Sequence, residues 1–206
     1  MLLTPEEAHA LTLPSHEAMQ DAHHDSMGLW NRLLLDFPKI ATALQSAEKY
    51  AFLHRLIGQH LAANVAANAR YIDALGFASL LIEDRALVRF KHLDGSFKPR
   101  AYPTNQQQHL GRQEFTEEMM EQLAIEGVLA PPTVLTLGYN ESNRGDAIDR
   151  IVIVCRTPSL QYFYDVKPGA AGFGPTVVQP FPGILPPAPR VISKRQEEEQ
   201  GAQDAD

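Results

Sequence analysis

The clearest hydrophobic pattern in the chain lies in residues 132–166, where apolar side chains alternate with polar ones in short runs. The runs cover 133–139, 151–155 and 160–166, and a polar segment, 140–149, separates the first two. A two-residue period is typical of a half-buried strand, and a short β-branched run is typical of a buried one. The pattern therefore predicts three strands joined as an antiparallel meander.

Residues 1–76 follow a three- to four-residue period instead, which predicts a mainly helical region. Thr4 followed by Pro5 is a favourable helix start, because threonine caps and proline fits the first turn. Further helices are expected from Ser15 towards His24, and from Asp25 or Ser26 through Leu34. The strongest apolar stripe predicts a long helix from Ser46 to about Ala74, ended by Gly76.

Between residues 79 and 102 the period returns to two, which predicts a β-hairpin region. We expect strands over 79–82 and 86–93, followed by an Asp94-Gly95 turn and a return strand over 97–102. Thr104 and Thr116 have the spacing of helix caps, so short helices are predicted within 104–127.

The remaining residues, 168–206, have a different composition. Residues 168–189 hold seven prolines and four glycines, and the last residues are highly charged. Such a segment is not expected to build a strand ladder or a helix, so a disordered C-terminal tail is predicted. The fold class is therefore α+β: one domain over 1–167, with N-terminal helices packed on a small antiparallel β-sheet.

Composition restricts the class of protein only broadly. The chain has 206 residues, of which 44% are hydrophobic, and a single cysteine. One cysteine allows neither an internal disulfide nor a cysteine zinc cluster, and no apolar run approaches the roughly 20 residues of a membrane span. The N-terminus lacks the pattern of a signal peptide. We therefore predict a cytoplasmic protein with no membrane partner.

Charge is unevenly distributed along the chain. Residues 85–112 carry six basic residues and one acid, a balance of +5, whereas residues 113–149 carry eight acids and one arginine, a balance of −7. Segregated blocks of this kind can steer a charged partner, although a half-exposed hairpin and a solvated helix produce the same counts.

A nuclease-like trio is one candidate for chemistry. Asp149 precedes one predicted strand, and Asp165 and Lys167 follow fifteen residues later. In metal-dependent nucleases two carboxylates hold a divalent cation and a lysine helps to activate water. Here the last two residues stand at a strand end, followed by Pro168 and Gly169, so strand-end charges at the exit to solvent also explain them.

Histidines supply a second candidate. His16 and His23 are seven residues apart, which would place them on one face of a helix, and a neighbouring aspartate could complete a metal site. The spacing lacks the second histidine at i+4 that a zinc-protease helix uses. A stray cluster on an exposed helix explains the same residues.

Nucleic-acid binding is a third candidate, centred on the basic hairpin. Aromatic residues interleave with its cations, which are Arg85, Arg89, Lys91, Lys98 and Arg100. Basic and aromatic side chains together bind single strands, but the same alternation describes many half-buried hairpins. The acidic chain as a whole lowers nonspecific affinity for phosphate backbones.

The tail offers a protein-binding candidate. Phe181, Ile184 and Leu185 lie on a proline-rich backbone, the form in which an extended peptide can dock at low entropic cost. No nucleotide-binding loop or serine nucleophile elbow occurs, and Cys155 falls in a predicted buried strand. No cofactor is predicted.

Short motifs between residues 80 and 166 resemble a group of uncharacterised bacterial proteins. They are Arg89-Phe90-Lys91-His92-Leu93, Tyr102-Pro103-Thr104 with Gln106–Gln108, Pro132, and Leu137-Gly138-Tyr139. Members of the group are associated with mobile elements and defence islands, sometimes beside a repressor-linked metallopeptidase of the ImmA/IrrE kind. This chain differs in its last strand, since its only tryptophan is Trp30. The resemblance implies a regulatory or toxin–antitoxin-like setting and carries over no catalytic residue.

Taken together, these patterns favour a non-enzymatic, protein-binding regulatory module whose partner is a protein encoded nearby. Two alternatives stay open. One is a metal-dependent nuclease that uses Asp149, Asp165 and Lys167, and the other is a nucleic-acid binder that uses the 85–102 hairpin.

Overall fold

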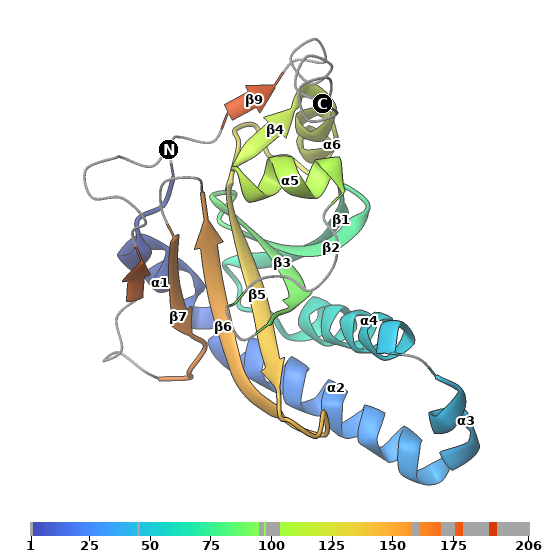
Figure 1. The fold of residues 1–206 in the computed structure, drawn as a ribbon. Helices are drawn as coiled ribbons and strands as arrows, with labels where there is room; N and C mark the ends of the chain where they lie inside the picture. Colours follow the sequence, from blue (N-terminus) through green and yellow to red (C-terminus); the bar gives the residue numbers. More distant parts are fainter. Residues whose placement is uncertain are drawn as a thin grey trace.

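A computed structural model describes most of the chain, and the ordered part has an α+β fold (Figure 1). The described residues are 2–44, 46–94, 97, 104–157, 161–169, 176–178 and 190–192. The helices are α1 (Pro5–Thr12), α2 (His16–Asp36), α3 (Pro38–Ala43), α4 (Ser46–Asn64), α5 (Asn105–Gly111) and α6 (Glu117–Ile125), with a 3-10 turn at Leu13–Ser15. The strands are β1 (Ala69–Ala74), β2 (Phe77–Ile82), β3 (Ala86–His92), β4 (Glu114–Thr116), β5 (Thr133–Glu141), β6 (Ile148–Arg156), β7 (Gln161–Asp165), β8 (Thr176–Val178) and β9 (Arg190–Ile192).

The main sheet has the strand order β1-β2-β3-β5-β6-β7-β8. Its neighbours run antiparallel except β3 and β5, which are parallel. The predicted α+β class and the antiparallel meander of β5, β6 and β7 are confirmed. The sheet is larger than predicted and mixed, because α5, β4 and α6 form the long connection that two parallel neighbours need.

The prediction of a return strand over 97–102 is wrong as far as pairing with β3 is concerned. Both edges of β3 are occupied: Arg89 pairs with Ser79 of β2 on one side and with Thr136 of β5 on the other. Of the predicted strand only Phe97 is described, as a bend. The Asp94-Gly95 pair predicts a hairpin turn, because the sequence alone does not show that β5 pairs with the second edge of β3.

After β3 the chain crosses the sheet instead of turning back along it. Leu93 lies over β5 at Gly138, where a Cβ atom would come within 2.3 Å of the leucine side chain. Asn140 of β5 donates to the Asp94 carbonyl oxygen at 2.8 Å. Phe97 then packs on Phe163 of β7, with 4.7 Å between ring centroids. Glycine at 138 therefore permits the crossing.

Two helix predictions need correction. A single helix, α2, runs through the expected break at Asp25 and Ser26, because the Ser26 hydroxyl donates to the Ala22 carbonyl oxygen within the helix and caps nothing. The long helix ends at Asn64, and the rest of the apolar stripe belongs to β1, which pairs with β2. Gly76, with φ of +69°, lies in the β1–β2 turn rather than at a helix end.

The predicted caps are confirmed. The hydroxyls of Thr4, Thr104 and Thr116 each accept a hydrogen bond from the backbone N–H three residues later, at the start of α1, α5 and α6. At α1 the Glu7 side chain accepts from the Thr4 N–H in return, which completes a capping box.

The helices divide between the two faces of the sheet (Figure 1). Residues of α1, α2 and α4 pack on the inner face, in a core that includes Met19, Leu53 and Phe90. On the outer face α5, β4 and α6 cover the β1–β3 side through Leu110, Phe115 and Leu123, and the crossing residues Leu93 and Phe97 cover β5 to β7. A cavity lies between these two covers.

Beyond Gly169 the predicted tail is described at two places, and both are strands. Thr176–Val178 extends the sheet beside β7, and Arg190–Ile192 runs parallel to β4. The expectation that 168–189 builds no ladder is therefore wrong at β8. The remaining tail residues, which include Phe181, Ile184 and Leu185, lie outside the described residues. Among those described, no helix has both the length and the apolar character to cross a membrane.

Candidate functional site

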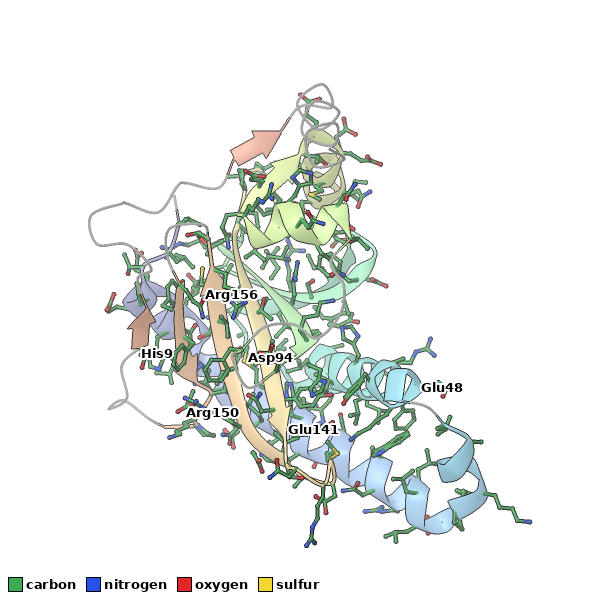
Figure 2. The ribbon with its side chains drawn as sticks, in the orientation of Figure 1. His9, Glu48, Asp94, Glu141, Arg150 and Arg156 are labelled. Carbon is green, nitrogen blue, oxygen red and sulfur yellow. The ribbon has the colours of Figure 1, made fainter. Side chains whose placement is uncertain are left out.

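A cavity of about 300 Å³ lies on the outer face of the sheet, between α5 and the crossing segment. Strands β3, β5 and β6 form its floor, and Phe97 forms part of its wall. Figure 2 shows Arg156 near the carboxyl end of β6, where β6 meets this cavity. The lining residues are Arg89, Phe97, Gln107, Gln108, Leu110, Gly111, Arg112, Gln113, Val134, Thr136, Val154 and Arg156.

Strand register determines which side chains share the floor. Ser79, Arg89, Thr136 and Val154 are successive cross-strand partners on β2, β3, β5 and β6. Neighbouring strands are about 4.8 Å apart, so these side chains stand in one row on one face. The row places a guanidinium between two hydroxyl-bearing residues in the middle of the sheet.

Arg89 is the unusual member of this row. Its exposed fraction is only 6%, and its Nε and Nη1 atoms lack a hydrogen-bond partner within the described chain. The face of Phe77 lies 5.6 Å from its Cζ atom. Burial lowers the pKa of the Arg89 guanidinium to about 10, which leaves it charged near neutral pH. A buried charge without a counterion is costly, so this guanidinium is a strong site for an anion.

The other two arginines that line the cavity differ from Arg89 in their contacts and exposure. Arg156 donates to the Phe97 carbonyl oxygen at 2.8 Å, and the charge of Asp94 opposes the lowering of its pKa by burial. Arg112 is exposed at the end of α5. Among the described residues that line the cavity there is no carboxylate. Arg89 is therefore the deep cation without a compensating charge.

Gln113 fixes the geometry of the cavity. Its side-chain amide accepts from the Val134 N–H at 2.7 Å and donates to the Val134 and Arg156 carbonyl oxygens at 2.9 and 3.3 Å. The side chain thus bonds to the backbones of β5 and β6 much as a further strand would. Its own backbone has φ of +62°, which is unfavourable for a residue with a side chain. This conformation is maintained by the buried bonds and joins the α5–β4 segment to the sheet.

Chemically, this arrangement can bind but offers little for catalysis. The described lining includes no Asp, Glu, His, Cys, Lys, Tyr or Ser side chain that could act as a general base or nucleophile. It offers guanidinium, amide and hydroxyl groups beside apolar walls, which is the composition of a ligand pocket.

The predicted nuclease residues come together in a second pocket, of about 310 Å³. Asp149, Asp165 and Lys167 all line it, with Gln20 and His24 of α2. However, the Arg150 Nε donates to Asp165 Oδ1 at 2.5 Å, and Lys167 Nζ lies 3.7 Å from Asp165 Oδ2. Asp165 is therefore bound between two cations, and nowhere in the described chain do three His, Cys, Asp or Glu side chains form a group that could hold a metal ion.

His16 and His23 lie on one face of α2, as predicted, but that face is buried against the sheet. The His16 Nε2 is 3.2 Å from the Thr12 hydroxyl, and its Nδ1 is 3.3 Å from the Lys167 carbonyl oxygen. The His23 Nδ1 is 2.6 Å from the Met19 carbonyl oxygen. Burial lowers the pKa of each imidazole to about 4, so both are neutral core side chains near pH 7. The expectation of an exposed helix face is wrong.

The predicted basic hairpin does not form one exposed surface. Arg85 is exposed and lies 3.5 Å from Glu7, whereas Arg89 is buried in the cavity floor. Burial and the charge of Arg89 lower the pKa of Lys91. Phe90, one of the aromatic residues that interleave with these cations in the sequence, faces the inner core. Lys98 and Arg100 lie outside the described residues.

Cys155 is buried, as predicted. Burial raises the pKa of its thiol to about 12, so it is not a ready nucleophile. Sequence reasoning singled out Arg89 for another role and missed Arg156 and Gln113. A cation inside the apolar run Leu87–Phe90 was the available signal, because buried strands seldom carry one.

Comparison with known proteins adds no relative to this geometry. The chain matches no protein-family model, no curated protein and no solved structure. Its function must therefore be inferred from its own residues and their arrangement.

Proposed function

We propose that the protein is a non-enzymatic binding module that takes an anionic group into the cavity above Arg89. One observation carries the proposal: Arg89, an arginine that is 6% exposed and whose buried Nε and Nη1 atoms lack partners within the described chain, lines the floor of a cavity of about 300 Å³. An anion placed in the cavity would supply the negative charge that Arg89 lacks. Buried charges in folded proteins are normally paired, so the bound state is the one that satisfies this residue.

A regulatory role fits a binding pocket without catalytic groups. In this proposal the anion belongs to a ligand, and binding of that ligand changes how the chain interacts with a protein encoded nearby. The setting is a bacterial mobile-element or toxin–antitoxin-like system. The acidic block over residues 113–149, which carries eight acids and one arginine, supports a positively charged partner. Co-purification with the neighbouring gene products tests this partner, and a partner-free monomer in the presence of each of them contradicts it.

Thermal unfolding in matched salts tests the binding proposal. Melting temperature is measured in acetate, benzoate or phosphate against chloride at equal ionic strength. A ligand that binds only the folded state stabilises it by RT ln(1 + [L]/Kd), so at least one anion should raise the melting temperature of the wild type as its concentration rises. Arg89→Met should abolish that rise.

Arg85→Met is the matched control, because Arg85 belongs to the same strand region but is exposed and outside the cavity. Its response to anions should equal that of the wild type. The proposal fails if no anion stabilises the wild type more than chloride does. It also fails if both variants respond alike.

The metal-dependent nuclease remains a second candidate because Asp149, Asp165 and Lys167 line one pocket. The ion pairs of Asp165 count against it, since a metal ion would have to displace Arg150. Incubation with DNA and RNA in magnesium or manganese decides the matter: cleavage that is lost in Lys167→Ala supports a nuclease. Absence of cleavage leaves the binding module as the function of the chain.

A further inference from the structure

The other residues that line the Arg89 cavity indicate which kind of anion it binds. The inference rests on the proposed function, because it assumes that the cavity binds an anion at all. Two features decide it: the number of buried charges that need compensation, and the character of the walls around them.

The charge of the cavity matches a single negative charge. Of the arginines that line it, Arg112 is exposed, and Arg156 bonds to the Phe97 carbonyl oxygen with Asp94 as a charge neighbour. Arg89 alone is deep and lacks partners for Nε and Nη1 within the described chain. A carboxylate carries one negative charge, whereas a phosphate monoester carries about −1.5 to −2 at neutral pH. Extra buried charge on the dianion would remain uncompensated.

Shape and hydrogen bonding also favour a carboxylate. The planar guanidinium presents parallel N–H donors that match the two oxygens of a carboxylate. Thr136 is the cross-strand partner of Arg89 and lines the same cavity, so its hydroxyl is a second polar group on the floor. The Gln113 amide already bonds to the backbones of Val134 and Arg156, so it is not available as a ligand donor.

The walls favour an apolar body attached to that carboxylate. Leu110, Val134 and Val154 line the cavity and are almost fully buried, and the ring of Phe97 adds an aromatic wall. Gln107 and Gln108 supply polar groups from α5. Apolar walls with a few polar groups at fixed points are what a hydrophobic small molecule with one charged end requires.

We propose that the cavity binds a small monocarboxylic acid with an apolar or aromatic body, with its carboxylate on Arg89 and Thr136 and its body against Val134, Val154 and Phe97.

Calorimetric titration of the full-length protein with matched probes tests the proposal. The probes are benzoate, its neutral analogue benzamide, the dianion phenyl phosphate, and acetate, which keeps the carboxylate and lacks the body. Benzoate should bind at least tenfold more tightly than each of the other three. Arg89→Met should weaken benzoate at least tenfold, and the exposed control Arg85→Met should leave it unchanged.

The outcomes separate this inference from the proposed function. If phenyl phosphate or acetate binds as tightly as benzoate and depends on Arg89, the ligand class is wrong but the anion site stands. If benzamide equals benzoate, or if no anion binds, the anion site falls together with the ligand class. Should Arg89→Met not fold, amide resonances of the wild type replace it: benzoate should shift Arg89 and Thr136 and leave Asp165 unmoved. Shifts at Asp165 instead would overturn the proposal.

Discussion

The two ends of strand β6 carry pockets of nearly equal size, about 300 and 310 Å³, whose buried or partly buried charges differ in whether they have a partner. At the start of the strand, the Arg150 Nε is bonded to Asp165 at 2.5 Å, and Lys167 lies on the other side of that carboxylate. At the far end, beside Arg156, the cavity contains Arg89 without a partner on Nε. Figure 2 shows Arg150 and Arg156 at these two ends.

Topology explains the difference. Antiparallel pairing of β6 and β7 puts Val152 opposite Asp165, which brings Arg150 of the same face next to that carboxylate. Parallel pairing of β3 and β5 instead places Arg89 between Ser79 and Thr136, in the middle of the sheet, where neither neighbour is charged. Charged side chains in the Asp165 pocket therefore pair with one another, whereas Arg89 has no charged neighbour in its row and would be stabilised by a bound anion.

Acid should produce the largest effect, and it should act on the inner face first. The unfolded chain binds protons at His16 and His23 below pH 6.5, whereas the folded chain binds them only near pH 4. The contribution of these two histidines to the free energy of unfolding is therefore greatest above pH 6.5. It decreases as the pH falls from 6.5 to 4 and no longer changes below pH 4. At about 1.4 kcal/mol per pKa unit, His23 alone should account for about 3 kcal/mol.

Urea unfolding between pH 7.5 and 4.5 measures this loss. His23→Leu should flatten the dependence, while His24→Gln, its exposed neighbour, should retain it. The His16 Nδ1–H donates to the Lys167 carbonyl oxygen, and Gln20 and His24 line the Asp165 pocket, so hydrogen exchange at pH 5 should rise there before it rises in α5. Equal acid dependence in both variants would contradict this account.

Gly138→Ala should remove the crossing that walls the Arg89 cavity. A Cβ atom at this position would lie 2.3 Å from the Leu93 side chain and 2.9 Å from the Lys91 carbonyl oxygen. Overpacking of this kind costs about 2–3 kcal/mol. Chemical denaturation measures it, with Gly28→Ala as the control, because nothing lies within 4 Å of a Cβ there. The control should be neutral or slightly stabilising, as alanine is in a helix interior.

Gln113→Ala should be almost as costly, at about 2 kcal/mol, because the Val134 N–H and carbonyl oxygen would lose a buried partner. Gln122→Ala on the exposed side of α6 should change stability by less than about 0.5 kcal/mol. The variant should also weaken anion binding in the Arg89 cavity. Unchanged stability would mean that this amide does not hold α5–β4 to the sheet.

Arg89→Met should change stability in the opposite direction. Replacing an uncompensated buried charge by an apolar side chain of similar length removes a desolvation penalty, so the ligand-free protein should become more stable by about 1–2 kcal/mol. Denaturation in chloride, without other anions, measures this gain. Clear destabilisation would show that the guanidinium is already satisfied and would remove the contrast between the two pockets.

Arg150→Met should give the smallest effect. The pair with Asp165 is partly exposed, and such ion pairs contribute about 0–1 kcal/mol. The guanidinium also lies over Phe97 at 4.9 Å and Phe163 at 5.4 Å, contacts that methionine can partly replace. A loss of less than about 1 kcal/mol, lower still in high salt, is expected in the same denaturation assay. A larger loss would mean that this end of β6 depends on its charges.

Local patterns in the sequence predicted the elements whose signals are local. Threonine caps, the β2–β3 turn and the β5–β7 meander depend on residues within a few positions of one another, and all are confirmed. The stripe through Ala69 and Ile72 fits a helix equally well. These residues form a strand because they pair with β2, a contact that the periodicity of the stripe does not show.

The candidate site depended on long-range pairing throughout. Arg89 lies in the cavity floor because β5 pairs with the second edge of β3. Gln113 contacts the backbones of β5 and β6, which lie far from it in the sequence. Asp149, Asp165 and Lys167 line one pocket, but the sequence did not show that Arg150 pairs with Asp165. The order of the strands indicates which side chains lie near one another, but it does not show whether their charges are already paired.

Observation of the arginine Nε–H groups by ¹⁵N NMR, during titration with benzoate, tests the central claim most directly. The account predicts that the Arg89 Nε–H resonance moves progressively as the anion binds, because a negative charge is then placed beside its guanidinium. The Arg150 Nε–H resonance should stay in place, because it is already bonded to Asp165. A stationary Arg89 signal, or movement at Arg150 instead, would contradict the account.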